Sequence, residues 1–424
     1  MLRLRARLLA AAVPIVVATG TSVLATVVIE GRSRRASRAA APEPARASSP
    51  SDPRHASGEK QRRVAGGRSA SAPPAGGRSL VSRLSLWQLA GQRIVYAYTG
   101  LTPPSSLLER IRAGEAAGVI FFAANIASPA QLRAVVARLQ AASTASAVHE
   151  PLLMMTDQEG GLVRRLPGAP ELSERQIGEA ADPPALAAQA GQATGRELAA
   201  AGINVNLAPV LDVYRQAGDF IDEAQRSYSM DPRTVASLGG AFIGAQQRVG
   251  VAATAKHFPG LGAAESGQDT DERAVTLGLP LRELRGVDEL PYRTAIAAGV
   301  RLVMTSWAVY PALDPALPAG LSSRVIGGEL RGRLGFHGVT VTDGLAAGAL
   351  ARFGAIPQRG VLAARAGADL LLCSALRVED NTPAEGMSVL EALARTLAGE
   401  PRERASAEHA AELVLKLRAA LSPR

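Results

Sequence analysis

Residues 252–260 read Ala-Ala-Thr-Ala-Lys-His-Phe-Pro-Gly, and the order of apolar and polar side chains in this stretch decides the fold. An apolar run at 252–255 is followed at once by Lys256 and His257, and a Pro-Gly pair comes next. The same order recurs in three other places, where residues 152–156 lead to Asp157, residues 203–208 lead to Asp212, and residues 339–342 lead to Asp343. In a (β/α)8 barrel, the polar side chains of the site lie at the C-terminal ends of several parallel strands. The stretch therefore predicts a TIM barrel with its site at that end.

The sequence from about residue 80 onward supplies the number of strands that a barrel needs. Short apolar runs alternate with Ala-, Leu- and Arg-rich stretches of helical length, such as 129–142, 184–201 and 233–249. Several runs are apolar on both faces, as expected of parallel strands that helices cover. An open doubly wound sheet would need a Gly-rich phosphate loop after its first strand, and residues 96–104 (YAYTGLTPP) are not one. The predicted strands are 92–98, 118–122, 152–156, 203–208, 252–255, 301–306, 339–342 and 369–373.

The first 79 residues differ in composition from the rest. Three arginines precede an uncharged stretch at 8–29, which is typical of a signal peptide or of a membrane anchor. No clear small-residue cleavage site ends this stretch, so an uncleaved anchor is slightly favoured. Residues 31–79 are rich in Arg, Ala, Ser and Pro, with too few large apolar side chains to fold, and predict a disordered linker. We therefore expect residues 1–30 to be a signal peptide or anchor, residues 31–79 a linker and residues 80–424 the barrel of an extracytoplasmic bacterial protein, membrane-anchored or secreted.

The net charge of +9 does not indicate a nucleic-acid partner, because it is concentrated in this tail. Residues 1–78 contain 14 Arg and Lys against 4 Asp and Glu, which leaves a net charge near −1 on residues 79–424. The one cysteine, Cys373, lies in an apolar run and excludes an internal disulfide and a cysteine-rich metal site. We expect a monomer that meets the membrane only through its N-terminal segment.

Asp343 is a candidate nucleophile because it directly follows the run at 339–342. A carboxylate on a strand end is rigidly mounted and partly desolvated, which suits attack on the anomeric carbon of a sugar. From position alone, capping of the next helix is an equally good interpretation. Asp212, after residues 203–208, is either a ligand of the substrate or a support for one.

Five further side chains are candidate sugar ligands. Lys256 and His257 are adjacent donors that suit sugar hydroxyls, although a salt-bridged lysine and a core histidine are the structural alternative. Asp157 and Arg165 lie eight residues apart across a Gly-Gly turn, so that both can return to one pocket and clamp diol oxygens. Arg226, in Gln225-Arg226-Ser227-Tyr228, is a weaker candidate for the same role.

The order of the motifs points to a family. The motifs are DQEGGLVRR at 157–165, APVLDV at 208–213, RSY at 226–228 followed by Asp-Pro, KHFPG at 256–260 and TDGL at 342–345. Over about 80–420 the chain resembles glycoside hydrolase family 3, specifically its compact single-domain β-N-acetylglucosaminidases. KHFPG together with DQEGG is highly specific, whereas the other motifs alone are not.

The resemblance implies a retaining double displacement on terminal N-acetylglucosamine, with cell-wall fragments as a natural substrate of an exported member. Asp343 would form a covalent glycosyl-enzyme, and neither a metal nor an organic cofactor is implied. The implied sugar-binding residues are Asp157, Arg165, Arg226, Lys256 and His257. A β-glucosidase, or a tethered barrel that binds glycans without cleaving them, are the alternatives.

One departure from the family pattern concerns the general acid/base. The family subgroup carries Asp-Ser-His in the loop after KHFPG, whereas this chain has Asp269-Thr270-Asp271 and no histidine there. Asp271, Asp269 or Glu265 would then serve as the acid. Slow turnover or glycosyl transfer, and loss of catalysis, are the other two possibilities. The remaining histidines, apart from His257, fall in the tail, before two strands or in the last helix.

Overall fold

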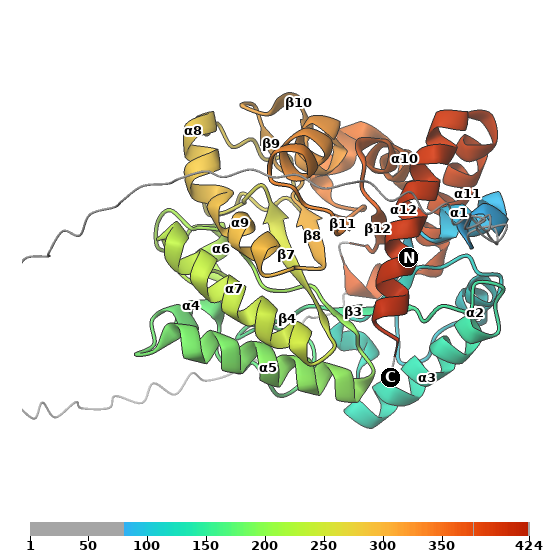
Figure 1. Ribbon diagram of the computed structural model, residues 1–424, viewed down its shortest axis with the longest axis horizontal. Coiled ribbons are helices and arrows are strands. Elements are labelled where there is room, and N and C mark those ends of the chain that lie inside the picture. The colour runs from blue at the N-terminus through green and yellow to red at the C-terminus, as the bar shows by residue number, and fades with distance from the viewer. Residues whose placement is uncertain (1–79, 376, 423–424) are drawn as a thin grey trace, which may run out of the picture. The chain divides into compact units, whose positions relative to one another are not determined.

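The computed structural model describes residues 80–375 and 377–422, and these form a closed barrel of eight parallel strands with helices around it (Figure 1). The order of hydrogen-bonded neighbours is β1-β12-β11-β8-β7-β6-β3-β2, and the last strand pairs with the first. The barrel strands are β1 Ile94–Tyr96, β2 Gly118–Ile120, β3 Leu153–Thr156, β6 Val205–Asn206, β7 Ala252–Phe258, β8 Leu302–Thr305, β11 Val339–Gly344 and β12 Leu370–Cys373. Each predicted strand contains one barrel strand or lies within it, so the TIM barrel is confirmed.

Side chains before each long helix explain where the helices start. In α3 (Pro129–Thr144), α5 (Pro183–Ala201) and α7 (Pro232–Arg248), a proline takes the first position, where a missing N–H costs nothing. Ser128, Asp182 and Asp231 precede them, and each side chain accepts a backbone N–H three residues on. The sequence placed these helices within two residues of their observed ends.

The remaining elements are shorter or lie at the C-terminus. The other helices are α1 Leu86–Gly91, α2 Ser105–Arg112, α4 Glu174–Gly178, α6 Phe220–Glu223, α8 Leu281–Glu283, α9 Leu290–Ala297, α10 Ile356–Ala366, α11 Pro383–Gly399 and α12 Pro401–Ala420. Two hairpins, β4 Gln158–Gly160 with β5 Val163–Arg164 and β9 Val309–Tyr310 with β10 Asp314–Pro318, lie outside the barrel. Short 3-10 segments are η1 Val81–Arg83, η2 Ala123–Asn125, η4 Ala319–Leu321, η6 Gly348–Phe353 and η7 Val378–Asp380, and η3 Leu284–Asp288 and η5 Arg324–Arg333 are π-helical.

Neighbouring side chains of a strand belong to different buried clusters, of which there are three among the described residues. In β1, Val95 belongs to a cluster with residues of other barrel strands, whereas Ile94 and Tyr96 pack with the surrounding helices. Val414 and Leu417 of α12 join the first cluster. Because successive residues of a strand point to opposite faces, this division separates the barrel interior from its outer layer.

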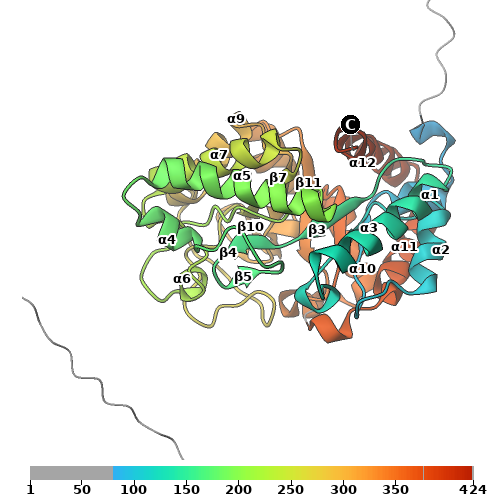
Figure 2. The same ribbon diagram turned by 90° about the horizontal axis from the view of Figure 1, so that it is seen from below.

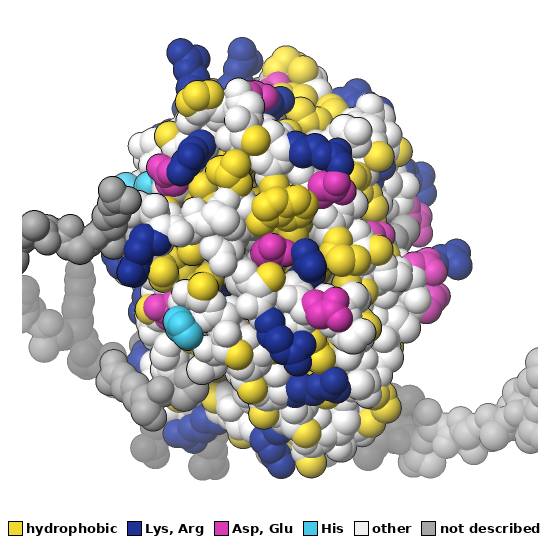
Figure 3. Space-filling model, turned by 90° about the vertical axis from the view of Figure 1, so that its right-hand side faces the viewer, with side chains coloured by type: hydrophobic (Ala, Val, Ile, Leu, Met, Phe, Trp, Pro, Cys, Tyr) yellow, Lys and Arg dark blue, Asp and Glu magenta, His cyan; other side chains and the backbone are white. Residues whose placement is uncertain are grey.

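Figure 3 shows one face, on which positive, negative and hydrophobic side chains are interspersed rather than gathered by charge. Within residues 80–375 and 377–422, none of the helices has both the length and the apolar character that crossing a bilayer requires. The predicted signal or anchor (1–30) and linker (31–79) lie outside the described residues. Cys373 is buried.

Candidate active site

One cavity of about 500 Å³ opens at the C-terminal ends of the barrel strands. It lies where a TIM barrel holds its site, because its lining includes residues from or just after β2, β3, β6, β7, β11 and β12. Of the ten side chains that the sequence named as possible catalytic or sugar-binding groups, eight line this cavity, and Asp212 and Glu265 do not. The charged and titratable lining residues are Asp157, Glu159, Arg165, Arg226, Lys256, His257, Asp269, Asp271 and Asp343.

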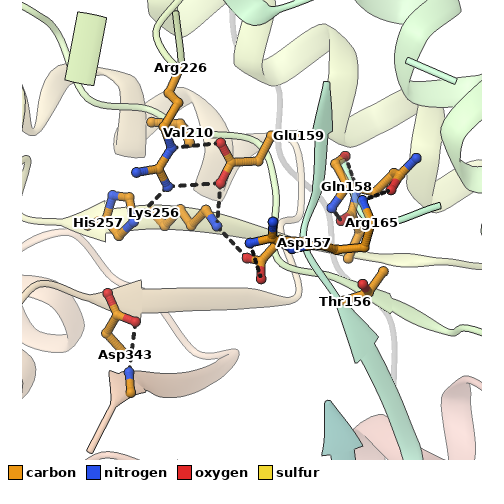
Figure 4. Close-up of polar contacts among 12 residues, drawn as sticks. Thr156, Asp157, Gln158, Glu159, Arg165, Val210, Arg226, Lys256, His257 and Asp343 are labelled. Atoms are coloured by element: carbon orange, nitrogen blue, oxygen red, sulfur yellow. Dashed lines mark hydrogen bonds and ion pairs between the residues drawn. The ribbon is translucent and has the colours of Figure 1, made fainter. Parts of the chain in front are cut away.

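Five of these side chains, those of Asp157, Glu159, Arg165, Arg226 and Lys256, form one ion-paired network (Figure 4). Lys256 Nζ lies 2.8 Å from Asp157 Oδ1 and 2.7 Å from Glu159 Oε1. The Arg226 guanidinium donates twice to Glu159, with Nε to Oε2 and Nη2 to Oε1 both at 2.9 Å. Such charge-assisted contacts fix the direction of each donor before a ligand arrives. The salt-bridged lysine that the sequence left open is therefore present, within the cavity wall.

The network keeps its carboxylates ionised in spite of burial. Burial disfavours the charge on Glu159, but Arg226 and Lys256 outweigh it and lower the pKa of that carboxyl. Burial likewise opposes ionisation of Asp157, and the charges of Lys256 and Arg165 hold its pKa below the usual value. The same contacts raise the pKa of Lys256 against burial. This wall of the cavity thus presents fixed, balanced charges at neutral pH.

A hairpin returns Arg165 to the cavity, as the Gly-Gly turn predicted. Gly160 and Gly161 have φ of 124° and 53°, conformations that favour glycine. The Gln158 side chain then holds the far end, because its Oε1 accepts the backbone N–H groups of Arg165 at 2.9 Å and Leu166 at 3.0 Å. Arg165 Nη2 lies 3.8 Å from Asp157 Oδ2. The pair can therefore act together on one ligand.

Asp212 does not line the cavity but orients His257, which does. Its Oδ2 accepts from His257 Nδ1 at 2.7 Å, and its Oδ1 accepts the backbone N–H groups of His257 and Leu261 at 3.2 and 2.6 Å. With the proton on Nδ1, His257 Nε2 is an acceptor, 3.5 Å from Arg226 Nη2. Of the two roles that the sequence allowed, Asp212 has the supporting one.

Asp343 lies in β11, apart from the ion-paired network (Figure 4). Its Oδ1 accepts the backbone N–H of Gly344 at 2.7 Å, and the Gly344 carbonyl accepts from Trp307 Nε1 at 2.9 Å. The next helical segment, η6, starts five residues later after Ala347 and has no side-chain cap. Capping of that segment is therefore excluded, and the half-buried carboxylate is left to line the cavity.

The loop after β7 brings a second carboxylate, Asp271, into the same cavity, close enough for its charge to interact with that of Asp343. Burial, together with the negative charges of Asp343 and Asp269, raises the pKa of Asp271 to about 7. Asp269 Oδ1 accepts the Asp271 backbone N–H at 2.8 Å, which shapes the turn between them. Glu265, the third candidate for the acid, is exposed and does not line the cavity.

No other histidine of the described residues lines this cavity. His149 borders a separate hollow with Ala420 and Leu421, and His409 lies in α12. The described residues contain no cluster of three or more His, Cys, Asp or Glu side chains suited to a metal ion.

Glu159 is a site residue that the sequence analysis missed. It is 1% exposed and joins Arg226 to Lys256, so it holds two predicted ligands in place. A signal was available, because Asp157 and Glu159 are two residues apart and such residues of an extended chain share a face.

The fold and the cavity define a (β/α)8 barrel with a cavity lined by carboxylates at the C-terminal ends of its strands. The family model described as "Glycosyl hydrolase family 3 N terminal domain" matches residues 91–415. The chain therefore belongs to glycosyl hydrolase family 3 and is an O-glycosyl hydrolase.

Named relatives are fungal and bacterial. An "Uncharacterized secreted glycosyl hydrolase" of Arthroderma benhamiae is 51% identical over 287 residues, which cover 67% of this chain and 81% of that protein. A "Beta-hexosaminidase" of Nitrosomonas eutropha is 36% identical over 262 residues, 60% of this chain and 72% of its own.

Two solved structures have the same barrel. A family 3 β-N-acetylglucosaminidase from Paenibacillus sp. str. FPU-7 matches 80% of this chain with 36% identity and a TM-score of 0.73, and this chain spans 64% of its length. A β-N-acetylhexosaminidase from Beutenbergia cavernae matches 79% of this chain with 33% identity and a TM-score of 0.71, over 98% of its own length.

Proposed function

We propose that the protein is a retaining glycoside hydrolase that removes terminal β-linked N-acetylglucosamine, or a related β-glycoside, from cell-wall or other glycans. The names of the β-hexosaminidase and β-N-acetylglucosaminidase relatives support the sugar. The single observation that carries the mechanism is the pair of carboxylates in one cavity, Asp343 and Asp271, with the pKa of Asp271 raised to about 7. A retaining mechanism requires one carboxyl group that can donate a proton near neutral pH and a second one that can attack the sugar.

In the first step, an Asp343 oxygen attacks the anomeric carbon while Asp271 gives its proton to the glycosidic oxygen. The bond from the anomeric carbon to the leaving group breaks as the bond to Asp343 forms. In the second step, the Asp271 carboxylate takes a proton from water, the water oxygen bonds to the anomeric carbon, and Asp343 is released. A pKa near 7 suits a group that gives and takes a proton in one cycle.

The ion-paired wall supplies the sugar-binding groups in this proposal. Asp157, Arg165 and Lys256 offer acceptors and donors to hydroxyls, and His257 offers Nε2. Because Glu159 already holds Lys256 and Arg226, and Asp212 holds His257, little side-chain entropy of these three residues is lost when a sugar binds. A preorganised wall is expected to fix the ring while the anomeric carbon meets Asp343.

We also place the working enzyme outside the cytoplasm. The Arthroderma benhamiae relative is called secreted. The basic and apolar start of the chain predicts export, as a cleaved signal or as an anchor.

A covalent label tests the nucleophile and the activity together. Incubation with a 5-fluoro-N-acetylglucosaminyl fluoride, followed by trypsin and mass spectrometry, should add one sugar to peptide 334–352, which contains Asp343. Asp343→Asn should remove both the adduct and turnover of an aryl β-N-acetylglucosaminide. An adduct on peptide 257–273 instead would overturn the assignment of Asp343.

The alternatives give different results in the same experiment. A β-glucosidase would be labelled by the matching 5-fluoroglucoside and not by the N-acetylglucosamine reagent. A barrel that only binds glycans would form no adduct, and its saturable binding would survive Asp343→Asn. Absence of turnover with every aryl β-glycoside by well-folded protein would reject the hydrolase mechanism.

A further inference from the structure

The loop that carries Asp271 is hydrogen-bonded to the segment that follows Asp343. Gly348 N–H donates to the Asp271 carbonyl at 2.6 Å, and Ala349 N–H donates to the Thr270 carbonyl at 3.1 Å. Gly348 and Ala349 begin η6, directly after the turn that leaves β11. The two carboxylates of the proposed mechanism are therefore linked through a short backbone contact as well as through the cavity.

This backbone contact leaves no space for a side chain at position 348. A Cβ added to Gly348 would lie 2.1 Å from the Glu272 carbonyl oxygen, 2.4 Å from the Glu272 carbonyl carbon and 3.0 Å from the Asp271 carbonyl oxygen. Each of these atoms is backbone, so no side chain can rotate away. Any larger residue at 348 must push the Asp271 loop outward or break the contact.

The segment that receives the loop is itself held from behind. Arg359 of α10 donates through Nη1 to the carbonyls of Leu345 at 3.0 Å and Ala347 at 3.3 Å, and through Nε to Gly354 at 2.8 Å. On the strand side, Trp307 Nε1 holds the Gly344 carbonyl. The segment 344–349, which we call the platform, is therefore held in place between β11 and α10, and the loop at 270–272 packs against it.

The side chain of Asp271 depends on this backbone contact for its position. An aspartate carboxylate is joined to Cα through one methylene group, so its reach is set almost wholly by where its backbone lies. Its own turn is fixed by Asp269, and the buried Thr270 and the Asp271 carbonyl rest on the platform. Movement of the loop by an ångström would carry the carboxyl away from Asp343.

We propose that Gly348 is a positioning residue, whose close contact with the loop at 270–272 sets the Asp271 carboxyl beside Asp343 for proton transfer. The proposal rests on the hydrolase function proposed above and on Asp271 as the proton-transfer group. It assigns no direct contact with substrate to Gly348. It accounts for the close approach of the loop backbone to the end of β11, because the side chain of Asp271 is too short to reach the site from a more distant loop.

Gly348→Ala tests the proposal, with Gly278→Ala as the control because an added Cβ at Gly278 meets nothing within 4 Å. For an alkyl β-N-acetylglucosaminide, whose leaving group needs a proton, kcat/KM of Gly348→Ala should fall at least about tenfold. For a 2,4-dinitrophenyl glycoside, which leaves without a proton, kcat/KM should stay within about threefold of wild type. Added azide, a nucleophile that needs no base, should restore kcat with this second substrate.

The outcomes separate the positioning role from a merely structural one. An equal fall in kcat/KM for both substrates, or wild-type values for both, would overturn the proposal, and Gly278→Ala should match wild type throughout. If Gly348→Ala does not fold, Arg359→Gln loosens the same platform without a clash and must give the same dependence on leaving group. Wild-type protein that forms no adduct on peptide 334–352 and turns over no substrate would instead reject the proposed function.

Discussion

At the scale of single residues, neighbours decide what each carboxylate of the cavity can do. Glu159 lies between Arg226 and Lys256, which lower its pKa in spite of burial. Asp271 lies near Asp343 and Asp269, and burial with these charges raises its pKa to about 7. Both side chains line the same cavity. The first is suited to permanent charge and binding, and the second to proton transfer.

Asp271→Asn is expected to abolish acid catalysis and its pH dependence. In wild type, kcat/KM for an alkyl glycoside should fall as pH rises through about 7, because Asp271 must be protonated to donate. The variant should be slower by about 10²–10⁴-fold and should lack that fall. Steady-state rates between about pH 5 and 9 measure both effects.

Asp269→Asn is the matched control for this prediction. Its amide oxygen can still accept the Asp271 N–H, so the turn should persist. Loss of one negative charge should lower the pKa of Asp271, so the fall in activity should move to lower pH while most activity remains. A wild-type pH profile in Asp271→Asn would show that another group donates the proton.

The same Asp271→Asn substitution is expected to stabilise the fold at alkaline pH. The folded state holds the Asp271 proton up to about pH 7, whereas the unfolded chain releases it near its ordinary pKa of about 3.9. Because the folded state binds more protons within that window, wild-type stability falls as pH rises through it. The neutral amide does not titrate, so the Tm of the variant relative to wild type should increase from about pH 4 to pH 8.

Thermal unfolding followed by circular dichroism measures this difference. Asp269→Asn should show a smaller increase, because it relieves only part of the repulsion on Asp271. A Tm difference that is constant across the pH range would contradict the assigned pKa.

At the scale of elements, apolar runs in the sequence were sufficient to predict every barrel strand. The geometry of the candidate site was predicted only in part. A strand covered on both faces must be apolar, so its sequence is distinctive. The turn between Asp157 and Arg165 was predicted, but the short strands β4 and β5 on either side of it were not. The π-helical turns of η3 and η5, which an ion pair between Arg285 and Glu329 joins across 44 residues, were not predicted either. The place of Asp271 beside Asp343 depends likewise on the contact with Gly348, which has no signal in local sequence.

The packing of α5 against α7 depends on Gly191, where an added side chain is expected to lower the stability of the fold. The two helices lie side by side in Figures 1 and 2, and a Cβ on Gly191 would lie 2.4 Å from the Phe242 carbonyl oxygen. Gly191→Ala should therefore lower the free energy of unfolding by about 1–3 kcal/mol. Urea titration gives this value from the transition midpoint.

Gly244→Ala on α7 is the control, and it is expected to raise the stability of the fold instead of lowering it. An added Cβ there meets only the end of the Arg248 side chain at 3.4 Å, an ordinary contact. Replacing a helical glycine by alanine should then stabilise by about 0.5–1 kcal/mol. If both variants shift the midpoint in the same direction, the close contact between Gly191 and Phe242 does not determine the stability of this helix pair.

At the scale of the whole barrel, the two ends have different tasks. The cavity and its carboxylates occupy the C-terminal ends of the strands. At the other end, α12 brings Arg418 to the residues that precede β2 and β3, where its guanidinium donates to the carbonyls of Ala116 at 3.3 Å, Glu150 at 2.7 Å and Pro151 at 2.9 Å. It also bonds Gln92 and Ser143. Chemistry and closure of the fold are thus separated along the barrel axis, as is usual for this fold.

Arg418→Met should consequently destabilise the protein without changing its kinetic constants. The side chain is 1% exposed, and its removal leaves buried carbonyls without a donor, which costs about 1–3 kcal/mol. Arg404→Ala, on the same helix, removes only an exposed pair with Glu408 and should cost about 0.3–0.5 kcal/mol. Urea midpoints and kcat/KM at 25 °C are measured on all three proteins. The cavity lies at the opposite end of the barrel from Arg418. A fall in kcat/KM for folded Arg418→Met would therefore mean that the contacts at the N-terminal ends of the strands affect the geometry of the site.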